Sequence, residues 1–159
     1  MGKISLTVDN GPHAVVTPEV LQVLADKEVS ATFFLIGEHV AEAGRLDSNL
    51  FSEDLIEYLC REGYTCALWN VVPRDWENLS GWGNRALDEM VGHQWSVVVV
   101  HDVLRGNAEQ ISAFIDRARD QGHEFVRECA PECLPIVAGR VTQDLASLTG
   151  TRSAPKDLE

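Results

Sequence analysis

The chain has 159 residues, of which 45% are hydrophobic and 24% charged, and this composition predicts one globular domain rather than a disordered chain. Its 13 basic and 25 acidic residues give a formal net charge of −12, which argues against a protein that binds the nucleic-acid backbone. No run approaches the roughly 20 apolar residues that cross a membrane, so no membrane-spanning segment is expected.

The first part of the chain alternates β-prone runs with helical patterns. The run 4–8 predicts a strand that ends at the turn signal Asp9-Asn10-Gly11-Pro12. Thr17 is expected to cap a helix that has Pro18 at its first position and Val20, Leu21 and Leu24 on its buried face. The next expected elements are a strand at 31–36, a helix at 38–43, a helix between Ser52 and Gly63, and a strand at 64–69.

The second part of the chain continues this alternation. A helix is expected over 82–91, with Ala86, Leu87, Met90 and Val91 inward, and is followed by the apolar strand SVVVV at 96–100. Asn107 and Gln110 resemble a capping box for a helix that ends at Gly122, and a short strand follows at 124–126. We predict a folded domain over 1–140 and a poorly ordered tail over 141–159.

The four cysteines carry little functional signal. Cys60 and Cys66 lie in apolar surroundings and are interpreted as small core residues. Cys129 and Cys133 are close in sequence, but no second pair stands at zinc-site spacing, so we do not expect a metal there. Free thiols, and a start that runs directly into strand-like sequence, favour a cytoplasmic protein.

The central strands are apolar on both faces, which is typical of a parallel sheet covered by helices. One interruption breaks the alternation, because the helices at 38–43 and after Ser52 follow each other with no strand between them. A regular β/α repeat would contain more chain around 44–50.

Polar side chains follow three of the expected strands, at the strand ends where parallel α/β folds place their chemistry. These residues are Asp9 and Asn10, then Asp75 and Trp76, and then His101 with Asp102. Each also has a simpler interpretation. Asp9 suits a turn, Asp75 a surface turn, and His101 a hydrogen-bonded core histidine. His13 follows the first turn and is placed to reach the same edge of the sheet.

These segments, in this order, resemble the polysaccharide deacetylases with a NodB homology domain, which form carbohydrate esterase family four. Residues 7–12 (TVDNGP) stand where the family has T-F-D-D-G-P, and residues 98–102 (VVVHD) match its fifth motif, L-L-H-D. The matching segments in between and after are 31–37, 63–70, 74–76 and 124–126. The resemblance implies a (β/α) barrel and metal-dependent hydrolysis of N- or O-acetyl groups on sugars.

The resemblance assigns roles to some residues of this chain and leaves others unfilled. It implies that Asp9 is the general base, that His101 is the general acid, and that Asp75 tunes His101. Trp76 would line the substrate groove, and Asn10 and His13 would contact substrate. Asn10 stands where the family has a metal-binding Asp, and the motifs that supply two metal-binding His and an Arg have no counterpart.

We therefore expect an incomplete barrel of the polysaccharide deacetylase type, about five parallel strands with covering helices, that has lost roughly two β/α units. No metal is expected, because the zinc ligands of the family are not retained. Two functions remain open. The first is an impaired hydrolase acting on non-peptide carbon–nitrogen bonds of acetylated sugars. The second is an inactive module that binds carbohydrate, with Trp69, Trp76 or Trp82 as platforms, or that binds protein. Exposed sheet edges predict a homodimer.

Overall fold

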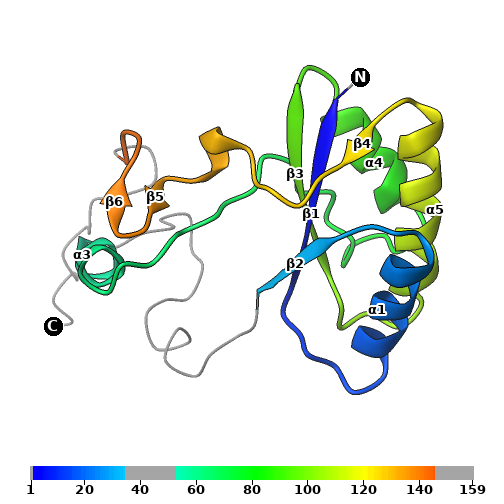
Figure 1. The fold of residues 1–159 in the computed structure, drawn as a ribbon. Coiled ribbons are helices and arrows are strands. Elements are labelled where there is room, and N and C mark those ends of the chain that lie inside the picture. The colour runs from blue at the N-terminus through cyan, green and yellow to red at the C-terminus, as the bar shows by residue number, and fades with distance from the viewer. Residues whose placement is uncertain (1, 35–52, 146–159) are drawn as a thin grey trace, which may run out of the picture. The chain divides into compact units, whose positions relative to one another are not determined.

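The computed structural model describes residues 2–34 and 53–145 (Figure 1). They belong to two compact units, of which the first includes 2–34 and 68–133 and the second includes 53–67 and 134–145. The expected helix at 38–43 and the interruption around 44–50 lie outside the described residues. Among the described helices, none combines the length and the apolar character that crossing a membrane requires.

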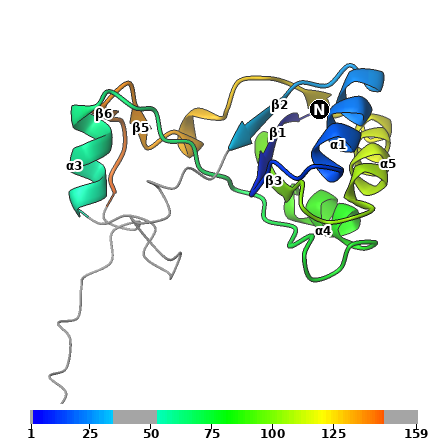
Figure 2. The same ribbon diagram turned by 90° about the horizontal axis from the view of Figure 1, so that it is seen from below.

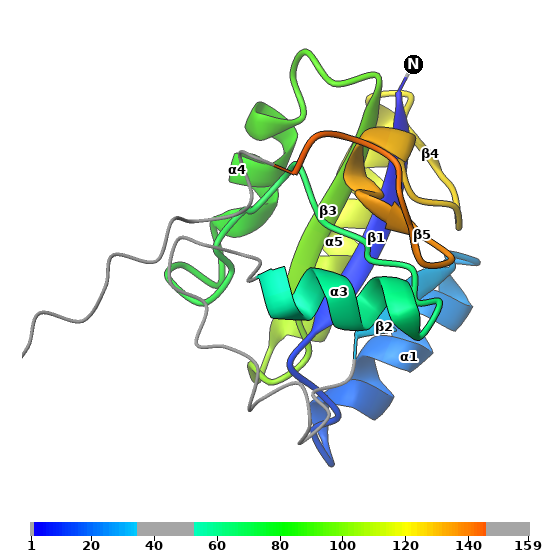
Figure 3. The same cartoon turned by 90° about the vertical axis from the view of Figure 1, so that its left-hand side faces the viewer.

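The first unit is built on a sheet of parallel strands with β1 (Lys3–Asp9) at its centre. Along its whole length β1 pairs with β3 (Trp95–His101), and Figure 3 shows the two strands side by side. The other side of β1 pairs with β4 (Glu124–Phe125) near its start and with β2 (Ala31–Phe34) near its end. The expected strands at 4–8, 96–100 and 124–126 are thus confirmed to within a residue or two, and 31–36 over its described part.

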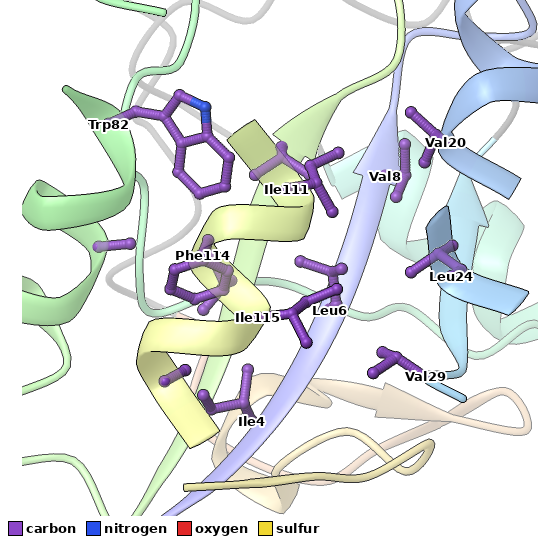
Figure 4. Packing of buried hydrophobic residues seen from close by; sticks show 14 of the residues in the cluster. Ile4, Leu6, Val8, Val20, Leu24, Val29, Trp82, Ile111, Phe114 and Ile115 are labelled. Carbon is purple, nitrogen blue, oxygen red and sulfur yellow. The ribbon is translucent and has the colours of Figure 1, made fainter. Parts of the chain in front are cut away.

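Three helices cover one face of this sheet: α1 (Val16–Asp26), α4 (Trp82–Glu89) and α5 (Asn107–Asp120) (Figure 2). Alternate residues of a strand face opposite sides of a sheet. Ile4, Leu6 and Val8 of β1 therefore face the helices, where they pack with Ile111, Phe114 and Ile115 of α5 (Figure 4). Burial of these side chains, at about 1.5–3 kcal/mol each, is the main force that holds the helices on the sheet.

The other residues of β1 and β3 face away from the helices. Among them Val97 packs with Ala130 and Cys133, and the partly buried Trp69, Trp95 and Cys129 lie against this second cluster. Burial raises the pKa of the Cys133 thiol to about 11, so it is a packing residue rather than a nucleophile. Asp9 and His101 continue this alternation, which places both at the carboxyl end of the sheet on the face away from the helices.

The outer edge of β3 is covered by a short irregular segment. Val71 makes an isolated parallel bridge with Val98, and the Asn70 side chain accepts a hydrogen bond from the Val97 amide at 2.7 Å. Asn70 also donates to the Trp95 carbonyl at 3.0 Å. Backbone groups on this edge of β3 are therefore paired within the chain.

The second unit contains α3 (Glu53–Arg61) and an antiparallel pair, β5 (Ile136–Val137) and β6 (Arg140–Val141). The expected helix after Ser52 is confirmed, with Gly63 in the left-handed region after its end. The expected strand at 64–69 is wrong. Cys66 makes only an isolated bridge, with its amide donating to the Ile136 carbonyl at 2.9 Å. An apolar run without a ladder partner remains irregular. The division into a domain over 1–140 and a tail over 141–159 stays a prediction.

Two side chains expected in the core are exposed instead. Val91 is 82% exposed because α4 ends at Glu89, and Leu21 is 50% exposed on the outer face of α1. Val20, Leu24, Ala86 and Met90 are buried as expected.

Candidate functional site

The site lies where β1 and β3 end. Asp9 and His101 are register partners on these two strands, so their side chains lie next to each other on the same face of the sheet. Asp75 comes from the segment between Val71 and α4, and its side chain is fully buried. The three residues to which the family resemblance assigns catalytic roles are therefore brought together, and all three belong to the first unit.

His101 and Asp75 form a close pair. Nδ1 of His101 lies 2.7 Å from Oδ1 of Asp75, and the backbone amide of His101 donates to Oδ2 of the same carboxylate at 2.8 Å. The hydrogen bond with Asp75 raises the pKa of His101, and partial burial of the ring opposes this rise. Because the carboxylate accepts at Nδ1, this nitrogen carries the proton and Nε2 is left to exchange protons with a bound molecule.

Asp9 is half-buried, and its Oδ1 is a buried oxygen without a hydrogen-bond partner. Burial raises the pKa of Asp9 to about 6. The charge of His101 lowers this pKa, whereas the carboxylates of Asp102 and Asp75 raise it further. A carboxylate with a pKa near 6 and a free oxygen is suited to accept a proton from water near neutral pH.

Asn107 stands behind Asp75, and the sequence did not reveal it as a site residue. The expected capping box is wrong, because the N-cap of α5 is Gly106 and no side chain caps this helix. The fully buried Asn107 amide instead donates to Oδ2 of Asp75 at 2.8 Å. A capping pattern is local, whereas these partners come from distant parts of the chain, so no sequence signal distinguishes the two roles.

The first turn is held by a second set of contacts. Thr17 does not cap α1 as expected. Its hydroxyl donates to Oδ2 of Asp102 and accepts from the His13 amide, the latter at 2.7 Å. Nδ1 of His13 in turn accepts from the amides of Val15 and Val16, each at 3.2 Å, and so serves the start of α1. His13 thus lies beside the site with Nδ1 already occupied, and its contact with substrate stays a prediction.

Trp76 is the aromatic side chain that borders the site. It is 52% exposed, and its ring meets the His101 ring edge-on at a centroid distance of 5.1 Å. Trp82 is fully buried and therefore cannot be a sugar platform, which corrects that expectation. Trp69 packs against the second cluster. Asn10 is exposed in the left-handed backbone region, which Asn tolerates.

The residues described at this site do not fit a zinc ion. Within 2–34 and 53–145, no three His, Cys, Asp or Glu side chains are grouped so that they could hold a metal. Zinc in proteins is bound by three or four such side chains, and the amide of Asn10 lacks the charge of a carboxylate. The described residues thus place a carboxylate next to a paired imidazole and do not group into a metal centre.

Comparison with known proteins identifies the family. The sequence model described as polysaccharide deacetylase matches residues 2–126. The chain belongs to the polysaccharide deacetylase family. The matched range includes Asp9, Asp75 and His101, so the site lies within the family domain.

Two curated relatives show how this family member compares in sequence. The chain is 48% identical to a chitooligosaccharide deacetylase of Rhizobium leguminosarum over 48 residues, which are 30% of this chain and only 21% of that protein. It is 25% identical to the peptidoglycan-N-acetylmuramic acid deacetylase PdaA of Bacillus subtilis, covering 77% of this chain and 68% of the relative.

Solved structures show the same fold. The catalytic domain of a peptidoglycan N-acetylglucosamine deacetylase from Eubacterium rectale superposes with a TM-score of 0.65 at 18% identity, covering 89% of this chain and 94% of that one. A mutant of a protein described as a CE4 family pseudoenzyme superposes with a TM-score of 0.61 at 17% identity, covering 77% of this chain and 64% of that one. The parallel sheet and its helices are thus of the polysaccharide deacetylase type.

Proposed function

We propose that this chain is a hydrolase for acetylated amino sugars whose rate on amides is impaired. One observation carries the proposal: Asp9, with an unpartnered oxygen, is the register partner of His101, and His101 is paired with Asp75. A carboxylate with an unpartnered oxygen next to such an imidazole can serve as the base and the acid of a hydrolysis. The names of the relatives supply the substrate class, an N-acetylated sugar.

The reaction is hydrolysis of an acetamide. Asp9 takes a proton from a water molecule while the oxygen of that water attacks the acetyl carbonyl carbon. The C–N bond then breaks while Nε2 of His101 gives a proton to the departing nitrogen. The products are acetate and a free amine. Asp75 accepts from Nδ1 throughout and stabilises the protonated imidazole.

The slow hydrolysis of amides follows from the lack of a metal site among the described residues. A positioned acid or base typically contributes about 10²–10⁴-fold, whereas a metal adds several kcal/mol by polarising the carbonyl. The described residues do not group into such a metal site. An acetyl ester, which has a better leaving group, is therefore expected to be cleaved faster than an acetamide.

We further propose that the sheet is an incomplete barrel that lacks one or two of the β/α units of its relatives. The match with PdaA spans 179 aligned positions but takes in 77% of 159 residues, which is about 122. The difference, 179 − 122, leaves about 57 positions of the relative without a counterpart, a length that fits one or two β/α units. Within the described residues, β2 pairs on one side only, and we propose that a second copy pairs there to form a homodimer.

A second function has its own support. The exposed Trp76 beside His101 offers an apolar ring face of the kind that stacks on sugars. The likeness to a CE4 family pseudoenzyme agrees with a chain that binds an acetylated sugar without cleaving it.

Acetate release from N-acetylchitotetraose and from p-nitrophenyl acetate separates the two functions. Hydrolysis is expected for the ester and, more slowly, for the sugar, and it should be lost in both Asp9→Asn and His101→Gln. Asp116→Asn, which changes an exposed carboxylate paired with Lys27, is the control and should keep the activity. Activity that survives in both site variants would overturn the mechanism. Binding of the sugar without any acetate release would favour the binding module.

A further inference from the structure

The amide of Asn107 joins three groups in the interior of the first unit. Its Nδ2 donates to Oδ2 of Asp75 at 2.8 Å and to the backbone carbonyl of His101 at 2.7 Å. Its Oδ1 accepts from the indole nitrogen of Trp82 at 2.9 Å. Asn107, Asp75 and Trp82 are all fully buried, so water does not compete for these hydrogen bonds.

Trp82 fixes the direction of this amide. An indole N–H is only a donor, so it must face the oxygen of Asn107 and not its nitrogen. A flipped amide would put its NH₂ against the indole N–H and its oxygen against the Asp75 carboxylate. Both contacts would be repulsive in a buried site, where an unpaired polar group costs about 1–3 kcal/mol. The NH₂ of Asn107 is therefore held toward Asp75.

The fixed Asn107 amide determines how Asp75 holds the His101 ring. Oδ2 of Asp75 is held by two donors, the Asn107 amide and the His101 backbone N–H, and this leaves Oδ1 aligned on Nδ1 of His101. The same Asn107 amide also holds the His101 carbonyl, so the backbone and the ring of His101 are both tied to one side chain. The other titratable groups that act on His101 are Asp9 and Asp102.

We propose that Asn107 is a positioning residue, which acts with Trp82 to hold Asp75 so that the imidazole of His101 keeps its proton on Nδ1 and turns Nε2 to the substrate. This inference extends the proposed function, because it takes His101 as the acid. It adds two residues that touch neither the substrate nor the reacting atoms.

The test measures the imidazole directly. Nitrogen-15 NMR of the neutral His101 ring gives its tautomer, and proton NMR gives the exchange rate of the Nδ1 proton. In the wild-type chain we expect one tautomer, with a slowly exchanging proton on Nδ1. Asn107→Leu keeps the size of the side chain and removes all of its hydrogen bonds. It should give a mixture of tautomers and faster exchange of this proton.

Trp82→Phe is the second variant, in case Asn107→Leu does not fold. It removes the indole N–H but keeps a ring against Phe114, from which the Trp82 ring centroid lies 5.3 Å away. Since the indole N–H of Trp82 donates to Asn107, and Asn107 in turn bonds Asp75 and the His101 carbonyl, a shift in the His101 tautomer here would support the relay. Asn84→Leu, at an exposed position of α4, is the control and should leave the His101 signals unchanged.

Acetate release gives the second readout. Both site variants should lower kcat by about 10- to 100-fold with little change in KM, less than the loss of about 10⁴-fold seen where the partner carboxylate itself is neutralised. An unchanged His101 tautomer in folded Asn107→Leu and Trp82→Phe would overturn the inference, whatever the activity. A wild-type chain with the expected tautomer but no hydrolysis would instead overturn the proposed function.

Discussion

The carboxylate of Asp102, directly after β3, occupies the space that a β-carbon on Gly11 would take in the turn after β1. A β-carbon at position 11 would come well within 3.0 Å of Cγ and both carboxylate oxygens of Asp102. Asp102 is 1% exposed and is held by the Thr17 hydroxyl, so it has little room to move away. Gly11 is thus required for space, and the contact fixes the turn that carries Asp9 and Asn10.

Gly11→Ala should therefore destabilise the chain. Forcing a methyl group into a packed interior typically costs about 1–3 kcal/mol, and the displaced Asp102 would also lose its bond with Thr17. Gly83→Ala is a matched comparison, because the one atom within 3.0 Å of its new β-carbon is Nη2 at the flexible end of Arg117, and Phe114 lies at an ordinary contact distance. Alanine also favours a helix over glycine by about 1 kcal/mol. The free energy of unfolding in urea should be lower for Gly11→Ala than for wild type, and for Gly83→Ala it should be no lower than for wild type. Equal effects of both would contradict the argument.

The raised pKa of Asp9 predicts a dependence of stability on pH. A carboxyl whose pKa rises from 3.8 to about 6 on folding binds its proton more tightly in the folded chain. This stabilisation is complete below about pH 4 and is lost as the pH rises through 6. Asp9→Asn, which never ionises, should therefore be more stable than wild type at pH 8. After screening at a half-exposed site the gain is expected to be about 1–2 kcal/mol.

Urea unfolding of wild type and Asp9→Asn at pH 4 and pH 8 checks this prediction. The difference between the two should nearly vanish at pH 4. Asp116→Asn, in an exposed ion pair with Lys27, serves as the control for loss of a negative charge. A wild-type chain that is the more stable of the two at pH 8 would show that the Asp9 carboxylate is better solvated than its burial implies.

The sequence predicts those elements whose signal is periodic and fails where a partner from elsewhere in the chain decides. β3 is largely apolar on both faces, and β1 alternates Ile4, Leu6 and Val8 with polar residues, so the sequence pattern alone predicts both strands. Thr17 and Asn107 have the residue type and place of helix caps, yet each gives its hydrogen bonds to an aspartate about 30 or more residues away. The run 64–69 is apolar without being a strand, because the backbone there finds only isolated bonding partners. Asp9 and His101 were predicted to lie together because strand ends and family motifs agree, whereas Asp75 rested on the motif alone, since the strand expected before it is not formed.

Asp75→Asn should lower the pKa of His101, because the hydrogen bond that the His101 ring donates to Asp75 is the main cause of its rise. The variant should also lose about 3–5 kcal/mol of stability, as a buried pair does when one partner is removed. A histidine with a raised pKa stabilises the fold fully below its unfolded pKa of about 6.5, and this is lost as the pH rises through the folded value. The stability gap between wild type and Asp75→Asn should thus be wider at pH 5.5 than at pH 9.

Proton NMR of the His101 ring, followed from pH 5 to pH 10, measures this pKa in both chains. A His101 pKa that is unchanged in folded Asp75→Asn would mean that the pair observed in the structure does not control the titration of His101.

Zinc should not bind at the deacetylase position. Incubation with zinc, removal of loose ion and elemental analysis should give well under one metal per chain, because the described residues do not group into a set of three ligands. Removal of metal with a chelator should likewise leave any ester hydrolysis unchanged. One zinc per chain, lost when Asp9, Asn10 or His13 is replaced, would show a rebuilt site and restore the metal-dependent mechanism of the family.

The edge of the sheet at β2 is where we expect a second copy. The edge at β3 is already paired through Asn70 and Val71, whereas β2 pairs only with β1 among the residues that the structure describes. Light scattering behind size-exclusion chromatography should give about twice the chain mass of 17.6 kDa. Thr32→Lys places a charge on this edge strand and should shift the mass toward one chain, because charged side chains oppose edge pairing. Thr65→Lys, in the second unit, should not. If all three chains are monomers at concentrations up to about 100 μM, association is weaker than about −5.5 kcal/mol and the dimer is overturned.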